Sequence, residues 1–195
     1  MNLVIATSNE GKLNEFKRIL SKSFDNIFSM KNIGIDEDIA EDGETLEENS
    51  LIKARFVKNF TPFCVLADDT GLCVNALNGK PGVRSARFFA ENATHAQNRA
   101  YLLKLMQGVT DRTACFSAVL TLILPDGNII VVKGETKGKI TFYEVGDGGF
   151  GYDSVFFSDE LGKTFAQATK EEKDRVSHRG KATLELIKRL EKTGI

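Results

Sequence analysis

The sequence contains few residues of the kinds that bind transition metals or form disulfides. It has only two histidines, His95 and His178, which nearly excludes a histidine-based transition-metal site. Its three cysteines are odd in number and lack C-x-x-C spacing, which argues against disulfides and zinc sites. Any bound metal should therefore be a hard ion that prefers oxygen ligands.

Long apolar runs and an excess of basic residues are also absent. No apolar run approaches the length of a membrane span, and the first residues lack the basic start and cleavage site of a signal peptide. The formal net charge of −1 argues against a broad nucleic-acid-binding surface. We therefore expect a cytoplasmic protein that binds neither nucleic acid nor membrane.

What the sequence does contain is a series of alternating strand and helix patterns. Its 195 residues, 42% of them hydrophobic, suffice for one domain with a substantial core. Strand patterns cover residues 3–6, 63–67, 114–124 and 129–132. The run at 63–67 is apolar throughout, as in a strand buried on both faces. The turn at 125–128 predicts an antiparallel hairpin.

Helix-start signals separate these strand patterns. Capping boxes at Thr45-x-x-Glu48 and Thr94-x-x-Gln97 open two helices, the first reaching about residue 60, and Ser177 caps a last helix that reaches about residue 191. The predicted inward-facing residues of the last two helices are Tyr101, Leu102, Leu105, Met106, Leu184, Ile187 and Leu190. Together these patterns predict a single α/β domain over residues 1–195. Its long twisted mixed sheet is flanked by helices, and its two lobes enclose a central substrate cleft.

A polar turn joins the first predicted strand to the first predicted helix. It consists of Thr7, Ser8, Asn9, Glu10, Gly11 and Lys12. Backbone N–H groups at such a helix start favour phosphate, and a lysine adds positive charge. The spacing matches neither a Walker A loop nor the dinucleotide fingerprint. An ordinary helix N-cap explains the same string, so both interpretations stay open at this point.

Two adjacent carboxylates, Asp68 and Asp69, follow the most buried predicted strand. Ligands of α/β sheets gather beyond the carboxyl ends of such strands, although a solvated turn explains the pattern equally well. Glu41, from a second acidic cluster, is our preferred partner of Asp69 in a magnesium site, since magnesium takes one or two protein carboxylates. Lys53 shares a polar helical stripe with Thr45 and Asn49, which is either a phosphate-binding face or, as is commoner, a solvated one.

A glycine-rich loop and the start of the last helix provide a second group of candidates. Residues 146–151 contain four glycines, and Phe150 and Tyr152 offer rings on which a nucleobase could stack. Core packing of these rings is the alternative. Lys173, His178 and Arg179 form a donor-rich cluster near the last helix start, although a buried, capped histidine is the more usual role for His178.

Six strings in order resemble the signature of the inosine triphosphate pyrophosphatase family, also called dITP/XTP pyrophosphatases. They lie at residues 7–12, 48–54, 67–72, 81–87, 149–153 and 177–179, and the likeness extends from about residue 3 to about residue 190. The resemblance implies hydrolysis of the triphosphates of inosine, deoxyinosine and xanthosine to the monophosphate and pyrophosphate. It also implies a magnesium requirement and a homodimer.

The resemblance also assigns roles to residues. Residues Thr7 to Lys12 would hold the triphosphate with Lys53, and Asp69 would be the catalytic carboxylate and a metal ligand, with Asp68 beside it. Thr70 stands where the family commonly has serine, and Ser154 replaces a frequent proline, which loosens the glycine loop. The residues that would enclose the base are Phe150, Gly151, Tyr152, Asp153, Lys173, His178 and Arg179.

Two alternatives accompany this hypothesis. A septum-formation-type nucleotide pyrophosphatase would share the broad architecture but prefer other bases, and the Ser177-His178-Arg179 string argues against it. A non-catalytic nucleotide sensor would have no use for Asp68 and Asp69 beside a phosphate loop, because carboxylates repel an anion unless a metal intervenes.

Overall fold

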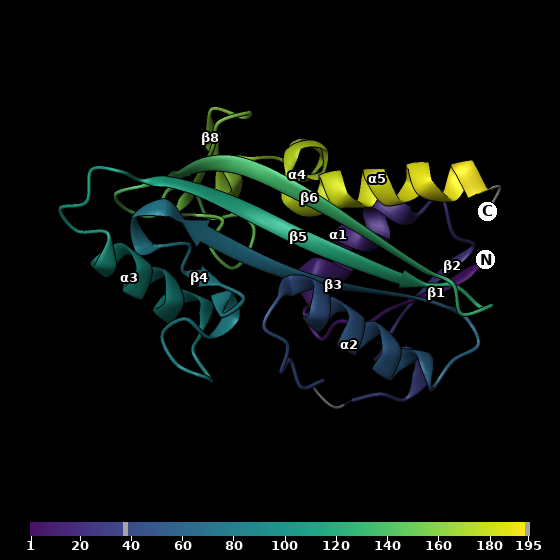
Figure 1. The fold of residues 1–195 in the computed structure, drawn as a ribbon. Helices are drawn as coiled ribbons and strands as arrows, with labels where there is room; N and C mark the ends of the chain where they lie inside the picture. Colours follow the sequence, from purple (N-terminus) through teal and green to yellow (C-terminus); the bar gives the residue numbers. More distant parts are fainter. Residues whose placement is uncertain (37–38, 194–195) are drawn as a thin grey trace. The chain divides into compact units, whose positions relative to one another are not determined.

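The computed structural model describes residues 1–36 and 39–193. Within these ranges one sheet has the strand order β2-β1-β3-β5-β6-β7-β8, with β4 paired to β3 (Figure 1). Strand β1 pairs in parallel with β2 and β3, whereas the β3–β4, β6–β7 and β7–β8 pairs are antiparallel. The strands are β1 Asn2–Ile5, β2 Asn26–Ser29, β3 Cys64–Val74, β4 Pro81–Gly82, β5 Thr113–Ile123, β6 Ile129–Ile140, β7 Phe156–Ser158 and β8 Lys163–Thr164. The predicted mixed α/β fold is therefore confirmed.

Five α-helices accompany the sheet in the described ranges. They are α1 Glu10–Leu20, α2 Leu46–Lys58, α3 His95–Leu105, α4 Lys170–Val176 and α5 His178–Thr193. The chain divides into two compact units. The first unit contains Met1–Asp69, Ala118–Gly134 and Arg179–Ile195, and the second contains Thr70–Ser117 and Glu135–His178.

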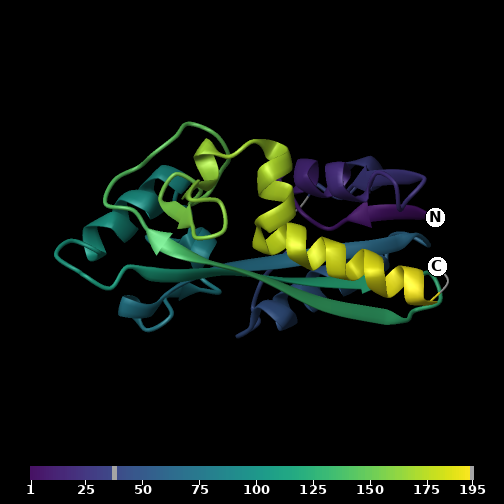
Figure 2. The same ribbon diagram turned by 90° about the horizontal axis from the view of Figure 1, so that it is seen from above.

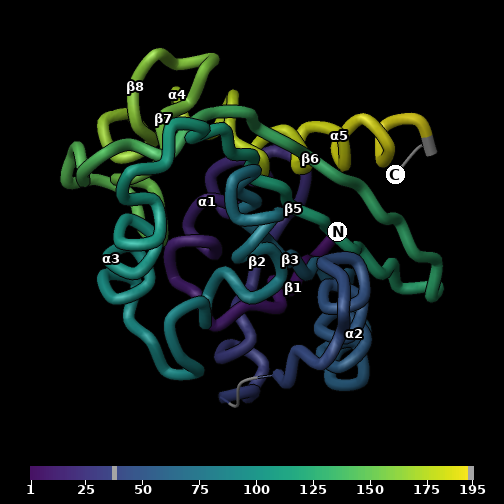
Figure 3. Tube along the Cα trace, turned by 60° about the vertical axis from the view of Figure 1, so that its left-hand side comes forward, coloured from purple at the N-terminus to yellow at the C-terminus, as the bar shows by residue number. Residues whose placement is uncertain are grey.

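The core of the first unit has two layers because strand side chains alternate between the faces of the sheet. Leu3 and Ile5 of β1 belong to a cluster that includes Phe16 of α1 and Leu186 of α5. Val4 instead joins a second cluster that includes Ala54 and Val57 of α2. Helices α1 and α5 therefore cover one face of these strands and α2 the other (Figures 2 and 3).

The second unit has its own core, dominated by aromatic rings. The ring centroids of Phe116 and Phe156 lie 4.7 Å apart in an edge-to-face arrangement, which is a favourable geometry for aromatic pairs. Phe165 belongs to the same cluster, together with Leu72 of β3 and Leu102 of α3. Strands β7 and β8 and helix α4, which the sequence patterns did not reveal, are part of this unit.

Local signals located the helix starts well. Both predicted capping boxes are present, with Thr45 and Glu48 closing the start of α2 and Thr94 and Gln97 that of α3. The predicted hairpin is found in β5 and β6, which are neighbouring strands. In the turn between them, the N–H of Leu124 donates a hydrogen bond to the carbonyl of Asn128. Strand β6 extends to Ile140, beyond the predicted end at residue 132.

The predicted inner faces of α3 and α5 need correction. Leu105 is 38% exposed and Leu184 is 42% exposed, so neither belongs to the core. The buried apolar residues of α5 are Ala182, Leu186 and Leu190, which follow the four-residue spacing of one helix face.

The prediction that Asp68 and Asp69 lie in a turn after a strand was wrong. Strand β3 continues from Cys64 to Val74, and both aspartates lie inside it and are buried. A charged pair ordinarily ends a buried strand because an unpaired buried charge is costly. Here each carboxylate has a cationic partner from another part of the chain, so the strand continues through them.

Candidate functional site

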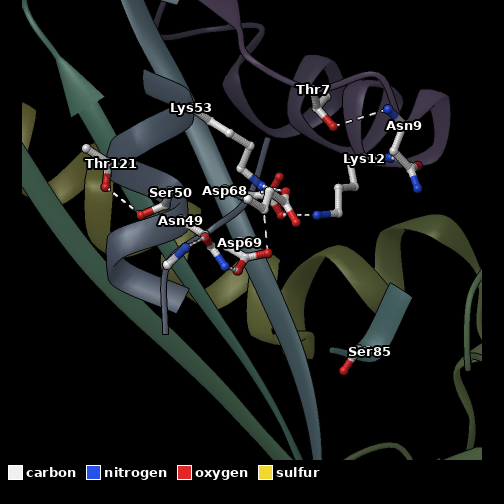
Figure 4. Close-up of polar contacts among 12 residues, drawn as sticks. Thr7, Asn9, Lys12, Asn49, Ser50, Lys53, Asp68, Asp69, Ser85 and Thr121 are labelled. Atoms are coloured by element: carbon white, nitrogen blue, oxygen red, sulfur yellow. Dashed lines mark hydrogen bonds and ion pairs between the residues drawn. The ribbon is translucent and has the colours of Figure 1, made fainter. Parts of the chain in front are cut away.

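The carboxylate of Asp68 is at the centre of a buried ion network in the first unit. Its Oδ2 atom lies 3.0 Å from Nζ of Lys12 (Figure 4). The same atom lies 3.3 Å from Nε of Arg179. Arg179 also donates from Nη1 to Glu15 of α1. Asp68, Glu15 and Arg179 are each at most 5% exposed. The network contains two anions and two cations and therefore balances its formal charges.

Asp69 points the other way, because consecutive residues of a strand project to opposite faces. Nδ2 of Asn49 in α2 donates to Oδ2 of Asp69 at 3.2 Å. Nζ of Lys53, one turn further along α2, lies 3.7 Å from Oδ1 of Asp69 (Figure 4). The same Nζ atom also donates a hydrogen bond to Glu41. Adjacent carboxylates thus face different helices, Asp68 toward α1 and α5 and Asp69 toward α2.

The two aspartates differ in their electrostatics as well as in their partners. Burial alone would raise the pKa of Asp68, but Lys12 and Arg179 outweigh it and hold that pKa well below its usual range. Burial raises the pKa of Asp69, and the effect of Glu41 adds to it while Lys53 opposes it. Asp68 is therefore a fixed anion, whereas Asp69 holds a proton more readily than an ordinary aspartate.

The pKa values of Lys12 and Lys53 also shift in opposite directions. Burial lowers the pKa of Lys12, although Asp68 opposes the shift. Burial also acts to lower the pKa of Lys53, but Asp69, Asp68 and Glu41 together outweigh it and raise that pKa. Since Lys53 is 7% exposed and Asn49 is fully buried, the solvated-face interpretation was wrong for these two residues of the stripe, whereas Thr45 at its start is exposed.

The polar turn at residues 7–12 forms the start of α1. Asn9 is the N-cap, and its side chain accepts a hydrogen bond from the backbone N–H of Lys12 at 3.0 Å. Oγ1 of Thr7 accepts from the N–H of Asn9 at 3.2 Å. Ser8 and Glu10 are exposed, and Gly11 is half-buried. The turn is thus a capped helix start, and its role in binding phosphate stays a prediction.

The residues expected to hold magnesium fit that ion in their chemistry. Glu41 and Asp69 both contact Lys53, so two carboxylates share one ammonium group. Their mutual repulsion contributes to the raised pKa of Asp69, and a divalent cation would relieve it. Among residues 1–36 and 39–193, no group of three or more His, Cys, Asp or Glu side chains is arranged to hold a metal. Two carboxylates are nevertheless within the number that magnesium takes from a protein.

Most residues predicted to contact a base lie in the second unit. Nζ of Lys173 lies 2.6 Å from Oδ2 of Asp153, and 4.6 Å from the ring centroid of Phe150. The same Asp153 oxygen accepts from the N–H of Phe150 at 2.8 Å. Gly151, which follows, has a φ of +61°. The loop is therefore held near α4 by a buried ion pair.

Tyr152 and His178 have core packing partners. Tyr152 is 6% exposed, and its hydroxyl donates to the carbonyl of Ser85 at 2.8 Å. The ring of His178 stacks on Phe116 with centroids 4.5 Å apart. Thr70 is half-buried in β3. The core-packing alternative therefore describes Tyr152, while the predicted base contacts of this group stay predictions.

Sequence reasoning missed Glu15 as part of the ion network. Its position three residues after Lys12 places both on one face of α1, which is the signal that was available. Asn49 lay on the noted stripe with Lys53 but received no role. Arg179, predicted as a base contact, belongs to the first unit, where it bonds both Asp68 and Glu15.

No helix in the described ranges combines the length and apolarity that crossing a membrane requires.

Comparison with known proteins shows which family the chain belongs to. A relative from Thermoanaerobacter sp. (strain X514), named dITP/XTP pyrophosphatase, is 46% identical over 98% of this chain and 99% of its own length. The solved Ham1 protein of Staphylococcus aureus is 39% identical and covers 99% of this chain and 100% of its own, with a TM-score of 0.86.

A second solved structure, a HAM1 protein from Coxiella burnetii, is 33% identical and covers 98% of this chain and 99% of its own, with a TM-score of 0.87. The model of the Ham1 family matches residues 3–189, which include every predicted site residue. Together with the likeness to these relatives along nearly the whole chain, this match shows that the chain belongs to the Ham1 family.

Proposed function

We propose that the protein hydrolyses nonstandard purine nucleoside triphosphates (ITP, dITP and XTP) to the nucleoside monophosphate and pyrophosphate. The observation that carries the proposal is the similarity, over nearly the full length, to relatives named dITP/XTP pyrophosphatase. The buried centre on β3 suits the chemistry, because it presents two lysines and two carboxylates of unequal proton affinity. This reaction would remove nonstandard purine nucleoside triphosphates from the nucleotide pool.

Magnesium is the cofactor we propose, with Asp69 and Glu41 as its protein ligands. When bound, it would neutralise phosphate charge and lower the pKa of a water molecule. Lys53 contacts both carboxylates and keeps them close together before the ion arrives. Asn49 orients the Asp69 carboxylate through its amide.

Four side chains of this site have further roles in the proposed reaction. Lys12 at the start of α1 provides positive charge for the departing pyrophosphate, and Lys53 adds to it. Asp68 fixes the position of Lys12 by a buried ion pair. Asp69 would orient the attacking water and accept its proton as a general base. Its raised pKa describes the metal-free protein, because a bound cation would oppose the repulsion by Glu41 that contributes to the shift.

Base choice would depend on donors that face the six-oxo group of hypoxanthine or xanthine. Lys173 and His178 in the second unit, and Arg179, are the side chains we propose for this recognition. Adenine carries an amino donor at that position and would leave such donors unpaired, at about 1–3 kcal/mol for each buried group. A site built on these hydrogen bonds rejects the wrong base by orders of magnitude.

The test is a substrate panel with product identification on the full chain and magnesium. We expect pyrophosphate and monophosphate from ITP, dITP and XTP, and far less turnover of ATP. Asp69→Asn should abolish turnover while the protein stays folded, and Asp159→Asn, which changes an exposed aspartate, is the matched control. Activity of Asp69→Asn above about a tenth of wild type, or release of orthophosphate and diphosphate, would refute the proposal.

The two alternatives are not favoured. Relatives that are 46% and 42% identical along nearly the whole chain are named dITP/XTP pyrophosphatase. A septum-formation-type enzyme would show a different base preference in the same substrate panel, and a sensor would bind ITP without releasing pyrophosphate. We further propose a homodimer, to be tested by light scattering, and a cytoplasmic location, to be tested by cell fractionation.

A further inference from the structure

The glycine-rich loop of the second unit is built from residues that restrain the backbone weakly. Gly146, Gly149 and Gly151 have φ values of +87°, +75° and +61°, a region that glycine adopts without steric cost. Serine at position 154 leaves its own φ freer than a proline would. A loop of this composition should move unless side chains outside it hold it in place.

Three side chains hold this loop from both ends. Oγ of Ser154, just after the loop, lies 2.8 Å from Oε2 of Glu144, just before it. Nε of Arg99 in α3 donates to the same Glu144 oxygen at 2.7 Å, and Nη1 of Arg99 donates to the carbonyl of Gly151 at 2.9 Å. One arginine therefore links α3, the segment before the loop and the loop itself.

Other contacts of the loop show where this restraint acts. The N–H of Val145 donates to the carbonyl of Ser154 at 2.8 Å, which closes the base of the loop. The N–H of Gly151 donates to Nδ1 of His95 at the start of α3, at 3.3 Å. Gly151 is thus held from α3 through both its N–H and its carbonyl, and the preceding Phe150 is held through its own N–H by Asp153.

We propose that Arg99, Glu144 and Ser154 form a clasp that positions the glycine loop for substrate. These are positioning residues, because they act through Gly151 and the neighbouring Phe150 ring. The inference rests on the proposed function, in which Phe150 and its neighbours contact the purine. A loop that is already ordered loses less conformational freedom when the nucleotide binds, so the clasp lowers KM.

The charge and exposure of the clasp set the size of its effect. The Arg99 side chain is 20% exposed and that of Glu144 is 43% exposed, so their ion pair alone contributes modestly. Its importance comes from connectivity, since Glu144 accepts two hydrogen bonds and Arg99 donates two. Losing Glu144 removes the bonds from Ser154 and from Nε of Arg99, and losing the Arg99 guanidinium removes the bond to Gly151. We expect either loss to raise KM for ITP about three- to tenfold.

The variants that test the clasp are Glu144→Ala, Arg99→Lys and their combination. Lysine keeps the charge of Arg99 but lacks the forked geometry that reaches two acceptors. Glu91→Ala is the matched control, because Glu91 pairs with Arg84 in an exposed ion pair of the same unit. The measurements are KM and kcat for ITP and the hydrogen exchange of amides 146–153.

We expect both single variants to raise KM while kcat stays within about twofold, and to speed exchange in the loop. The double variant should resemble the single variants, since residues that act as one unit are not additive. Glu91→Ala should match wild type. Unchanged loop exchange, an unchanged KM despite faster exchange, or additive effects in the double variant would overturn the proposal.

The experiments distinguish a failure of the proposed function from a failure of the proposed clasp. If the wild-type protein releases no pyrophosphate from ITP, dITP or XTP, the proposed function is wrong. If the wild-type protein is active and Glu144→Ala leaves both exchange and KM unchanged, the function stands and the clasp is wrong.

Discussion

Replacing Asp68 should destabilise the protein strongly and replacing Asp69 should hardly change its stability, although the residues are neighbours. Asp68→Asn removes the only carboxylate that contacts both Lys12 and Arg179 in the described network, and leaves Arg179 with Glu15. Breaking a buried ion pair by removing one partner costs about 3–5 kcal/mol. In a protein of 195 residues, this corresponds to a fall in Tm of about 6–20 °C.

Asp69→Asn should leave stability within about 1 kcal/mol of wild type. The raised pKa of Asp69 means that its charge is less favourable in the fold than in the unfolded chain. An asparagine oxygen can also accept the hydrogen bond from Asn49. This variant should therefore be folded and inactive, while Asp68→Asn should be unstable.

The pH dependence of unfolding separates the two residues further. The folded-state pKa of Asp68 lies below its unfolded value of about 3.9, so its contribution is present above that pH and is lost as pH falls toward the folded value. The pKa of Asp69 is raised, so stability falls as pH rises from the unfolded toward the folded value. Asp68→Asn should flatten the acid limb of the stability curve.

The assay is thermal and urea unfolding of the metal-free protein at several pH values, with Asp159→Asn as the control. Equal losses of stability in Asp68→Asn and Asp69→Asn would refute the reasoning, because they would show that the two carboxylates share one environment. A wild-type Tm in Asp68→Asn would refute it as well.

Further predictions concern the metal ligand, a buried phenol and a close backbone contact. Glu41→Gln should raise the magnesium concentration needed for half-maximal activity by at least about tenfold, measured by magnesium titration, and chelation should abolish turnover of the wild type. Burial raises the pKa of Tyr152, so the ultraviolet difference between wild type and Tyr152→Phe should show ionisation only above the usual tyrosine value of about 10; a midpoint at that value would contradict its burial. Gly138→Ala would place a Cβ 2.1 Å from the carbonyl oxygen of Phe157 and should cost about 1–3 kcal/mol in urea unfolding.

The sequence predicted features that depend on neighbours a few residues apart. The capping boxes at Thr45 and Thr94 are examples, because each needs only a hydroxyl and a carboxamide or carboxylate three residues later. The hairpin after β5 is another, since its turn residues are contiguous. These interactions are local, so a single sequence contains the information needed to predict them.

The ion network could not be predicted in the same way. Arg179 and Asp68 are separated by 111 positions, and Arg179 and Glu15 by 164. From the sequence alone, Asp68 was expected to lie in a turn after the strand, since no cationic partner is near it in the sequence. Its partners, Lys12 and Arg179, come from α1 and α5. Only the tertiary fold supplies those partners, and for the same reason Arg179 gave no sign that it was paired.

The alternation of Asp68 and Asp69 makes the length of β3 upstream of them critical. Ile5 of β1 faces Leu66 in the parallel pairing, which fixes where the two aspartates fall. One inserted or deleted residue between Leu66 and Asp68 would turn each carboxylate to the opposite side of the sheet. Because the surroundings set each pKa, a carboxylate turned away from Lys12 and Arg179 would lose the charges that hold its pKa low. A frame change of one position would therefore separate both aspartates from the partners that give them their different roles.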